Sequence, residues 1–576
     1  MDNSLVEKNL GIDFGSTYTI MSHYNIENDR VDAIQTQNGS RYIPSVACLD
    51  DDDQLLFGQE AKNEMTYSPD LRCFRAFKML LPEKKRVTLE RNGYSDDYCP
   101  EYVAKEFLRR YCSVAKKECD LGQQDQFDKL VVCIPDNWKN ELDSLSGKAI
   151  LREICTELDI AKRIQIVTEP AAASAFFAYN FSKKAESHFN GKILIIDYGG
   201  GTLDISLTEV TTITRPDGSS AMEIEIRDHT GAGDNHRDRI GAAGLAYMDS
   251  VARLALAEAG VEDVVVDGDF LQVVNKLEER LMLHADELAD RVMSEYPATF
   301  ITREMEDDHE LFVNCKYNRK KISITYSMLF RAYMDTIYPV LDEQLRDVRS
   351  RFDDKGFDPA KDTATSKIAI VGGFGQFILV QQQVLDFFQV CGSDIDITTG
   401  TDTGKEDAVS FGASLIASGV ITMRKTAPMS IGMRTFVSGK KTFKFAIDYR
   451  QELEYDRMYP VGDTWEPILI GPSSDPSETV WAFAVNDGPD KHWATRMIPL
   501  PEKLQKLESE VSPGLYYLAF SMDDSEIYSL HVIPCAKTLP WEPLFEQRRE
   551  PISLGNFYDM FGSVVSIQED DILYAL

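Results

Sequence analysis

The chain has 576 residues, 43% of them hydrophobic, which is enough for a large globular core and for three or four compact units. Its formal net charge of -33 opposes binding to nucleic acid or to anionic lipid, so we expect neither partner. Ten cysteines without a C-x-x-C pair indicate neither a zinc site nor a disulfide framework. The N-terminus lacks a signal-peptide pattern, and no apolar run approaches the ~20 residues that span a bilayer, so we expect a cytoplasmic protein.

Residues 10–20 read LGIDFGSTYTI, which predicts two short strands joined by a tight turn. Glycine backbone amides can approach an anion closely, and neighbouring hydroxyls can add hydrogen bonds. Asp13 stands at the end of the first strand, where its carboxylate is placed to hold a cation. The candidate phosphate-binding residues of this turn are Gly15, Ser16, Thr17 and Tyr18.

The next segments alternate between helical and strand patterns. Apolar residues at helical spacing predict a helix over residues 68–80, with Lys78 on a face of its own. Residues 101–119 predict an amphipathic helix. Residues 129–138 indicate a buried strand that ends at Pro135 and precedes a helix over 141–158. Residues 164–179 predict a strand, then Glu169-Pro170 and an alanine-rich helix, because proline in the first helical turn costs no hydrogen bond. Glu169 is therefore fixed at a strand end.

Residues 193–207, ILIIDYGGGTLDISL, repeat the N-terminal pattern and organise the chain. A buried strand ends at Asp197, three glycines turn the backbone, and an alternating strand returns. Two such hairpins can close on a metal-bound polyphosphate from opposite sides, whereas no G-x-x-x-x-G-K-[ST] string supports a P-loop. The candidate residues here are Asp197, Gly199, Gly200, Gly201, Thr202 and Asp204.

Three later stretches extend this second half. Gly231 and Gly233 are predicted to stand before a helix whose N-terminus can receive phosphate. Residues 251–293 are almost entirely helical in pattern, and residues 406–417 predict another helix. Gly372 and Gly373 follow a buried strand, where the backbone could pass close to an adenine ring. Beyond residue 421, segments such as 442–448, 479–485 and 514–522 alternate as strands do.

From about residue 9 to residue 418, these motifs resemble the actin-like ATPase superfamily and, within it, the 70-kilodalton heat-shock chaperones of the DnaK type. The resemblance implies an α/β fold with two ribonuclease H-like lobes over residues 1–422, divided near residues 192 and 193. A smaller β-rich domain over residues 423–576 would then be a reduced substrate-binding domain. No long helical lid follows the strands, which is similar to a divergent, lid-less branch of the family.

The resemblance also implies roles for the candidate residues. Asp13 and Asp197 would hold Mg²⁺, mostly through its waters, and Lys78 would offset charge on the γ-phosphate of ATP. Glu169 and Asp204 would orient the attacking water, while Thr202 and the first-turn hydroxyls would donate to phosphate oxygens.

Two departures concern adenosine. The family's Glu-x-x-Lys-Arg is not clear in residues 275–287, which leaves Lys276 and Arg280 as weak candidates. Phe374 and Gln376 replace the usual Ser and Arg after the glycine pair.

We therefore expect a slow Mg²⁺-dependent ATPase, binding ATP and ADP, whose lobe closure regulates a C-terminal module that binds a polypeptide client or a co-chaperone. A sugar or acetate kinase, an actin-like filament former and a non-hydrolysing nucleotide sensor remain alternatives from the same superfamily. The stretch ITMRKTA at residues 421–427 replaces the family's leucine-rich linker. We expect its docking to be weak and sensitive to salt, because it offers few apolar anchors and two basic residues. The client, the co-chaperone and the oligomeric state are not indicated.

Overall fold

The computed structural model describes the following residues: 7–36, 38–50, 52–67, 72–81, 83, 86–135, 147–185, 188–214, 218, 220–232, 243–261, 264, 268–295, 307–352, 356–390, 395–396, 407–424, 427, 430–437, 440–448, 451–454, 457–462, 465–470, 483–486, 494–498, 514–522, 528–538, 542–555 and 572–574. The chain forms two compact units. The first comprises residues 1–138 and 147–423, and the second comprises residues 139–146 and 424–576.

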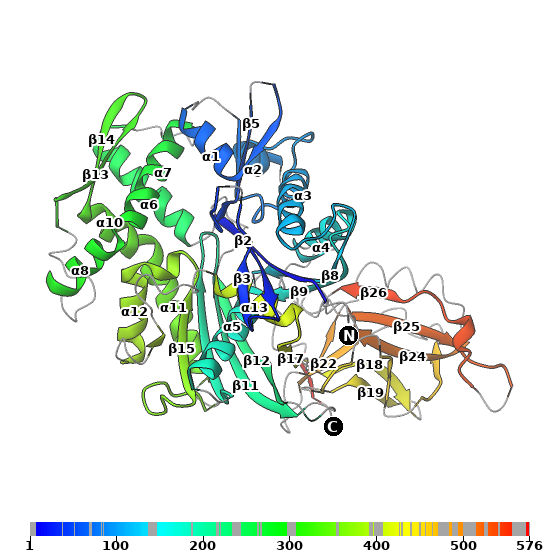
Figure 1. Ribbon diagram of the computed structural model, residues 1–576. Coiled ribbons are helices and arrows are strands. Elements are labelled where there is room, and N and C mark those ends of the chain that lie inside the picture. Colours follow the sequence, from blue (N-terminus) through cyan, green and yellow to red (C-terminus); the bar gives the residue numbers. More distant parts are fainter. Residues whose placement is uncertain are drawn as a thin grey trace. The chain divides into compact units, whose positions relative to one another are not determined.

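The first sheet of unit 1 is built around the N-terminal strand and has the order β3-β2-β1-β8-β9, with β4 paired to β2 (Figure 1). Strand β1 pairs antiparallel with β2 on one side and parallel with β8 on the other. The strands are β1 Asn9–Phe14, β2 Tyr18–Asn25, β3 Arg30–Ala33, β4 Ile43–Pro44, β8 Phe127–Ile134 and β9 Ala161–Thr168. This is the predicted hairpin with a parallel extension.

The second sheet repeats this arrangement, in the order β16-β15-β10-β11-β12-β17. Its strand β10 pairs antiparallel with β11 and parallel with β15, as β1 does with β2 and β8. The strands are β10 Gly191–Tyr198, β11 Leu203–Thr214, β12 Ser220–Ala232, β15 Ser366–Val371, β16 Ile395–Asp396 and β17 Ile421–Met423. The repeat seen in the sequence is therefore a repeat of topology, and the mixed α/β class is confirmed.

Residues along the middle of β10 alternate between two hydrophobic clusters, which explains why residues 193–196 are all apolar. Leu194 and Ile196 join the cluster with helices α6 (Gly244–Glu258) and α12 (Ile378–Phe388). Ile193 and Ile195 join a cluster with helices α5 (Glu169–Ala185) and α13 (Ala408–Ala417). The strand is thus buried on both faces, as predicted.

Helices cover both sheets of unit 1. They are α1 Gly58–Tyr67, α2 Arg86–Arg91, α3 Pro100–Glu118, α4 Gly147–Glu157, α5 Glu169–Ala185, α6 Gly244–Glu258, α7 Gly268–Leu283, α8 Ala285–Glu295, α10 Tyr326–Ala332, α11 Tyr338–Phe352, α12 Ile378–Phe388 and α13 Ala408–Ala417. A short π-helix, Tyr333–Ile337, joins α10 to α11. The hairpin of β13 Leu311–Tyr317 and β14 Lys320–Thr325 packs beside α6 and α7. The predicted helices over 101–119 and 251–293 are confirmed in outline, and the start of the helix predicted over 141–158 lies outside the described residues.

Helices α5 and α13 cross at very short range, because both carry small residues. A Cβ on Gly412 would lie 1.7 Å from the carbonyl oxygen of Ala172, so only glycine fits at this crossing. Helix α13 is also tied to the first sheet through Ser22, whose hydroxyl donates to the Ser410 carbonyl at 2.8 Å. The crossing and the buried serines fasten the two halves of unit 1 together.

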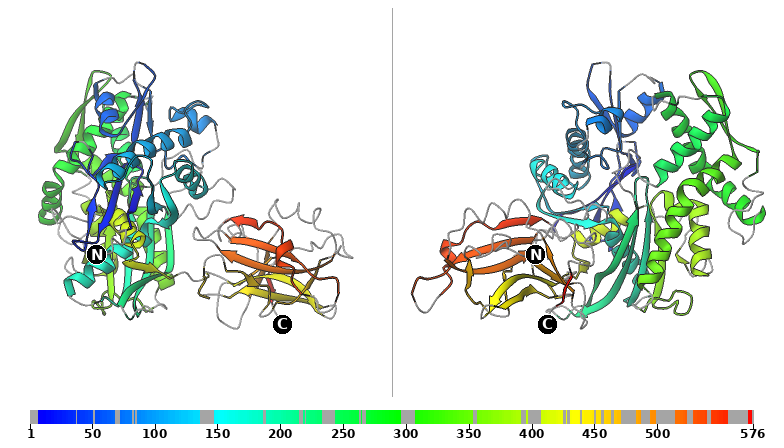
Figure 2. Two further views of the ribbon diagram at one scale, coloured as in Figure 1. Left: turned by 45° about the vertical axis from the view of Figure 1, so that its right-hand side comes forward. Right: turned by 180° about the vertical axis from the view of Figure 1, so that it is seen from behind.

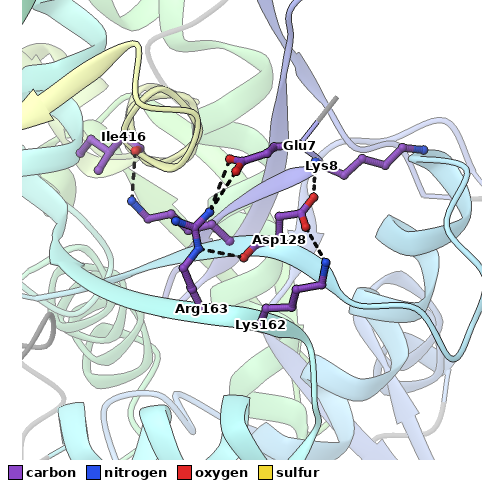
Figure 3. A network of polar contacts seen from close by, with 7 residues as sticks. Glu7, Lys8, Asp128, Lys162, Arg163 and Ile416 are labelled. Carbon is purple, nitrogen blue, oxygen red and sulfur yellow. Dashed lines mark hydrogen bonds and ion pairs between the residues drawn. The ribbon is translucent and has the colours of Figure 1, made fainter. Parts of the chain in front are cut away.

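A polar network at the beginning of β1 fastens the N-terminal edge of the first sheet (Figure 3). The Asp128 carboxylate accepts from the Lys8 amide at 2.9 Å and from Lys162 Nζ at 2.7 Å. Arg163 reaches both the Glu7 carboxylate and the Asp128 carbonyl, each at 3.4 Å. These contacts join β1, β8 and β9 at the end of the sheet away from Asp13.

A small third sheet, in the order β6-β5-β7, corrects one prediction. Its strands are β5 Val46–Leu49, β6 Leu55–Phe57 and β7 Cys73–Arg75. The predicted helix over 68–80 is wrong in its described part, because Phe74 alternates with half-buried neighbours as a strand residue does, and β7 pairs antiparallel with β5. Ala76 then takes a positive φ of 55°, which interrupts any helical path before Lys78.

Unit 2 contains two antiparallel sheets, β19-β18-β22-β23-β27 and β20-β24-β25-β26 with β21 on β24, and Figure 2 shows them as two layers. The strands are β18 Ser430–Val437, β19 Lys440–Ile447, β20 Tyr459–Pro460, β21 Ile468–Ile470, β22 Phe483–Asn486, β23 Ala494–Ile498, β24 Gly514–Met522, β25 Tyr528–Pro534, β26 Ile552–Gly555 and β27 Ile572–Tyr574. The strands predicted over 442–448 and 514–522 are confirmed. The segment predicted over 479–485 is described only from residue 483 onward.

Candidate functional site

The two predicted metal-binding carboxylates occupy equivalent positions in the two sheets. Asp13 is the last but one residue of β1 and lies opposite Cys133 of the parallel strand β8. Asp197 is the last but one residue of β10 and lies opposite Val371 of the parallel strand β15. Ligands of α/β sheets bind at the carboxyl ends of parallel strands, so both side chains stand where such a site is expected.

The first hairpin turn requires glycine. A Cβ on Gly15 would lie 2.1 Å from the carbonyl oxygen of Tyr18, a separation that no side chain tolerates. The Thr17 carbonyl accepts from the Ser45 amide at 2.8 Å, and the Tyr18 hydroxyl contacts Lys62 Nζ at 3.0 Å. These bonds fix the turn against β4 and α1.

The second hairpin turn lies directly against the first. The Gly199 amide donates to the Thr202 carbonyl at 2.9 Å, which closes the turn. A Cβ on Gly200 would lie 2.2 Å from Thr17 Oγ1, and one on Gly201 would lie 2.9 Å from Ser16 Oγ. The two glycine turns therefore face each other at van der Waals distance, and any side chain there would separate them.

Lys78 and Glu169 form an ion pair beside these turns. Both are buried, with 2% and 7% of their surface exposed. Burial lowers the pKa of Lys78, but the carboxylates of Glu169 and Asp13 raise it more, so the net shift is upward and the ammonium stays charged. Lys78 comes from the chain after β7, and Glu169 begins α5, so the fold brings together two residues that are 91 positions apart.

Asp197 and Asp204 are opposite each other on β10 and β11, and both are buried. Burial, followed by the nearby Glu169 and Asp204 carboxylates, raises the pKa of Asp197 well above its usual range. Burial and Glu169 likewise raise the pKa of Asp13 to about 7. The site thus concentrates more negative charge than Lys78 alone can balance.

A hydrated divalent cation fits this chemistry. Mg²⁺ keeps several waters and binds through one or two carboxylates, so it requires no protein cage. Among the described residues, no group of three or more His, Cys, Asp or Glu side chains forms such a cage. The raised carboxyl pKa values are the observation that favours a cation, because a bound positive charge would remove the repulsion that causes them.

Gly231 is predicted to stand before a helix, and it lies near the end of a strand, with the next described helix beginning at Gly244. Gly231 belongs to β12 and pairs with Asp204, and a Cβ on it would lie 3.2 Å from the Asp204 carboxylate. The nearest described helix, α6, begins at Gly244, and the amides of Gly244 and Leu245 donate to the carbonyls of the second glycine turn at 3.1 and 2.8 Å. Gly233 lies outside the described residues, and the nucleotide roles of both glycines stay predictions.

The glycine pair Gly372-Gly373, which follows β15, lies beside the Asp197 carboxylate. Gly372 has a φ of 80°, and a Cβ there would lie 2.6 Å from Asp197 Oδ1, whereas the Cβ position of Gly373 faces open space. Phe374 is buried, and its ring centroid lies 5.1 Å from that of Tyr198 and 5.2 Å from that of Tyr247. These ring contacts hold the residue that follows the glycine pair in place.

Lys276 and Arg280, the two weak candidates for adenosine binding, interact with residues of the second half of unit 1. Lys276 pairs with Glu279 at 2.7 Å, and Arg280 donates to the Phe312 carbonyl at 3.2 Å.

Sequence reasoning missed three contributors to this region. Cys133, the last but one residue of β8, lies beside Asp13, and burial followed by Asp13 raises the pKa of its thiol. Asp407, fully buried before α13, pairs with Arg41 at 3.0 Å and raises the pKa of Asp13. Arg75 of β7 pairs with Asp249 of α6 at 3.7 Å. Each depends on long-range contacts, for which the sequence contains no local signal.

These features define a mixed α/β protein in which two sheets of like topology bring acidic strand ends and glycine turns together. Residues 9–435 match the family model described as Hsp70 protein. The chain therefore belongs to the Hsp70 family. Among the described residues, no helix has the length and apolar character to cross a bilayer.

Similarity to individual relatives is low but extended. The chain is 24% identical over 453 residues to the chloroplastic "Heat shock 70 kDa protein 6" of Arabidopsis thaliana, covering 74% of this chain and 55% of the relative. It is 24% identical over 456 residues to "Chaperone protein DnaK" of Thermus thermophilus, covering 74% and 64%. A DnaK of Metamycoplasma hominis is 31% identical over 230 residues, covering 39% and 32%. The chain thus matches less than two thirds of the length of these relatives.

Proposed function

We propose that this chain is an ATP-binding and ATP-hydrolysing protein of the chaperone type, with the two sheets of unit 1 acting as the lobes of an actin-like ATPase. The observation that carries the proposal is the buried Lys78–Glu169 ion pair at the meeting point of two glycine turns and two acidic strand ends. Family membership supports ATP binding and hydrolysis at the level of the family.

Each residue has a role in this proposal. Asp13 and Asp197 would hold Mg²⁺ through its waters, and the ion would offset charge on the β- and γ-phosphates. The turn amides and the hydroxyls of Ser16, Thr17 and Thr202 donate to phosphate oxygens. Lys78 supplies a fixed positive charge beside the transferring phosphoryl group, and Glu169 holds Lys78 in place. Glu169 and Asp204 accept hydrogen bonds from the attacking water and so orient it.

Nucleotide-dependent control of unit 2 is part of the proposal. Strand β17, the last strand of unit 1, pairs parallel with β12, and Ile421 is completely buried. A change in the second sheet would therefore reach the chain immediately before unit 2. We propose that unit 2 is a β-rich module for a polypeptide client or co-chaperone, as a reduced form of the family's substrate-binding domain.

The test is release of ADP and phosphate by the purified chain, with Mg²⁺ and with EDTA, and without any phosphate acceptor. Turnover that needs Mg²⁺ and no acceptor supports the ATPase. Turnover that appears only with an added sugar or acetate identifies a kinase of the same superfamily. Tight binding of ATP without turnover identifies a non-hydrolysing sensor.

Two variants test the roles proposed for Lys78 and Glu169. Lys78→Ala and Glu169→Gln should slow hydrolysis more than they weaken ATP binding, because their contribution concerns the transferring group. Lys105→Ala is the matched control, since Lys105 forms an exposed ion pair with Glu157 on the surface of α3. An equal loss of ATP binding and turnover in the site variants would show that the Lys78–Glu169 pair has a structural role and not a role in hydrolysis.

A further inference from the structure

Two cysteines face each other across the small sheet of unit 1. In the antiparallel pairing of β5 with β7, Cys48 and Cys73 are Cα partners. The Leu49 amide donates to the Arg72 carbonyl at 3.0 Å, so the hydrogen-bonded pair is the next one along. Cys48 and Cys73 consequently form a non-hydrogen-bonded pair, in which Cα atoms lie about 4.5 Å apart and side chains approach most closely.

This geometry is within the range of a disulfide. Disulfides join residues whose Cα atoms are roughly 4.4–6.8 Å apart, so side-chain rotation can link these two with little movement of the backbone. Directly opposed residues project from the same face of a sheet. Consistent with that, both side chains pack against the same hydrophobic cluster. Both are thiols in the structure.

The two thiols differ in access. Cys48 is fully buried, and its Sγ lies 3.9 Å from the Ala61 carbonyl oxygen of α1. Cys73 is only half-buried. A reagent in solution can therefore meet Cys73 first, and Cys48 is positioned behind it to resolve the product.

We propose that Cys48 and Cys73 form a reversible disulfide when a low-molecular-weight disulfide oxidises the protein. The Cys73 thiolate attacks the reagent's S–S bond, which gives a mixed disulfide and releases one reagent thiolate. The Cys48 thiolate then attacks the Cys73 sulfur and releases the second thiolate. Two electrons pass from the protein thiols to the reagent, and the two thiol protons leave with the reagent as thiols.

The bond would fasten the segment that leads to Lys78. Lys78 follows Cys73 by five residues, and Ala76 makes the intervening turn. A covalent link between β5 and β7 adds to their backbone pairing and holds the base of this segment in the sheet. The proposed modification site therefore precedes Lys78 in the chain and includes neither residue of the ion pair.

Burial makes the reaction slow at neutral pH. It raises the pKa of Cys73 to about 11, an effect that Arg75 partly opposes, and the pKa of Cys48 to about 12. The acidic groups that face Cys48 and raise its pKa further are Glu64, Asp50 and Glu60. Because the thiolate is the nucleophile, formation should accelerate roughly tenfold per pH unit below these pKa values.

The experiment treats the full chain with oxidised glutathione at pH 8.0 and at pH 9.5, blocks remaining thiols, and maps peptides by mass spectrometry. We expect a linked peptide pair containing Cys48 and Cys73, two hydrogens lighter than the separate peptides and reversed by dithiothreitol. Cys315 is the matched control. It is also a half-buried strand thiol whose pKa burial raises to about 11, but Ile322 stands opposite it. It should carry glutathione without a link.

Two variants separate the steps. In Cys48→Ala, Cys73 should accumulate the glutathione adduct, because no second thiol resolves it. In Cys73→Ser, Cys48 should stay unmodified, because it is buried. Absence of the Cys48–Cys73 link in the wild type at pH 9.5, or a link from Cys73 to another cysteine, overturns the proposal. The measurement needs no nucleotide, so its result is independent of ATPase activity.

Discussion

Lys78 is paired with Glu169 in the interior of unit 1, where the Lys78 side chain is 2% exposed and the Glu169 side chain 10%. Removing one partner of a buried pair leaves the other charge uncompensated, which typically costs about 3–5 kcal/mol. Lys78→Ala should therefore lower the free energy of unfolding by about this amount without nucleotide. Urea unfolding measures it, with Lys105→Ala as the surface control.

The same pair can be tested by replacing both partners. Lys78→Met with Glu169→Leu removes the two charges together, so we expect it to recover more than half of the stability that Lys78→Ala loses. If the double variant is as unstable as the single one, the other carboxylates, and not Glu169, are what Lys78 balances.

The raised pKa of Asp13 predicts how Mg²⁺ stabilisation depends on pH. Its folded pKa of about 7 lies above the ordinary value of 3.8, so the folded protein binds more protons, and stability from this group is lost as pH rises from about 4 to 7. A bound cation would remove this loss. The increase in melting temperature given by Mg²⁺ and ADP should therefore be larger at pH 8 than at pH 6.

Asp13→Asn is the companion variant. It should raise the melting temperature of the metal-free protein at pH 8 by about 2–4 °C, the shift that ~1 kcal/mol gives in a large domain, and it should weaken the response to Mg²⁺. Thermal unfolding monitored by intrinsic fluorescence measures both effects. An unchanged Mg²⁺ response would remove Asp13 from the proposed metal site.

Unit 2 contains its own pH-sensitive group. His531 Nε2 is 2.7 Å from Ser521 Oγ, and its Nδ1 is buried without a hydrogen-bond partner among the described residues. Burial, followed by Arg548, lowers the pKa of His531 below 6.5. A lowered folded pKa means that the unfolded chain binds more protons, so stability is lost as pH falls through about 6.5. Protease cleavage within unit 2 should rise between pH 7.5 and pH 5.5, and His531→Gln should reduce this dependence. A pH-independent cleavage rate in the wild type would contradict the assignment.

The sequence predicted the two hairpins because their signals are local: apolar strands, an aspartate at the strand end and glycines that no other residue can replace. It failed at β7, since pairing with β5 is a long-range contact and overrides the helical spacing of Phe74 and Phe77. It did not indicate that Gly231 lies opposite Asp204, because this contact depends on the pairing of β12 with β11 and not on a local signal. The Lys78–Glu169 pair required the fold, since nothing local indicates that a lysine is buried.

The ion pair between Arg75 and Asp249 predicts an effect on nucleotide release. It joins β7 to α6, on the two halves of unit 1, and the two side chains are 15% and 20% exposed. An ion pair of this kind contributes about 1 kcal/mol, so Arg75→Ala should speed release of a fluorescent ADP analogue roughly fivefold. Arg110→Ala, which removes an exposed pair with Glu60 within one half, should leave the rate unchanged.

The last prediction concerns the chain between the two units. We expected residues 421–427 to dock weakly and through charge, but Ile421–Met423 forms β17, pairs with β12 at Met222, Glu223 and Ile224, and buries Ile421 completely. Thr422 adds a hydrogen bond to the Met222 carbonyl at 3.3 Å. Backbone pairing and apolar burial are little screened by ions, in contrast to exposed charge pairs. Protection of residues 420–424 from proteases should therefore persist from 0.05 M to 0.5 M salt, and Ile421→Asp should abolish it at both. Arg424→Ala, which removes the exposed pair with Glu452 at 3.6 Å, should have little effect. Protection that disappears at high salt in the wild type would show that charge, and not the β12–β17 pairing, holds this segment.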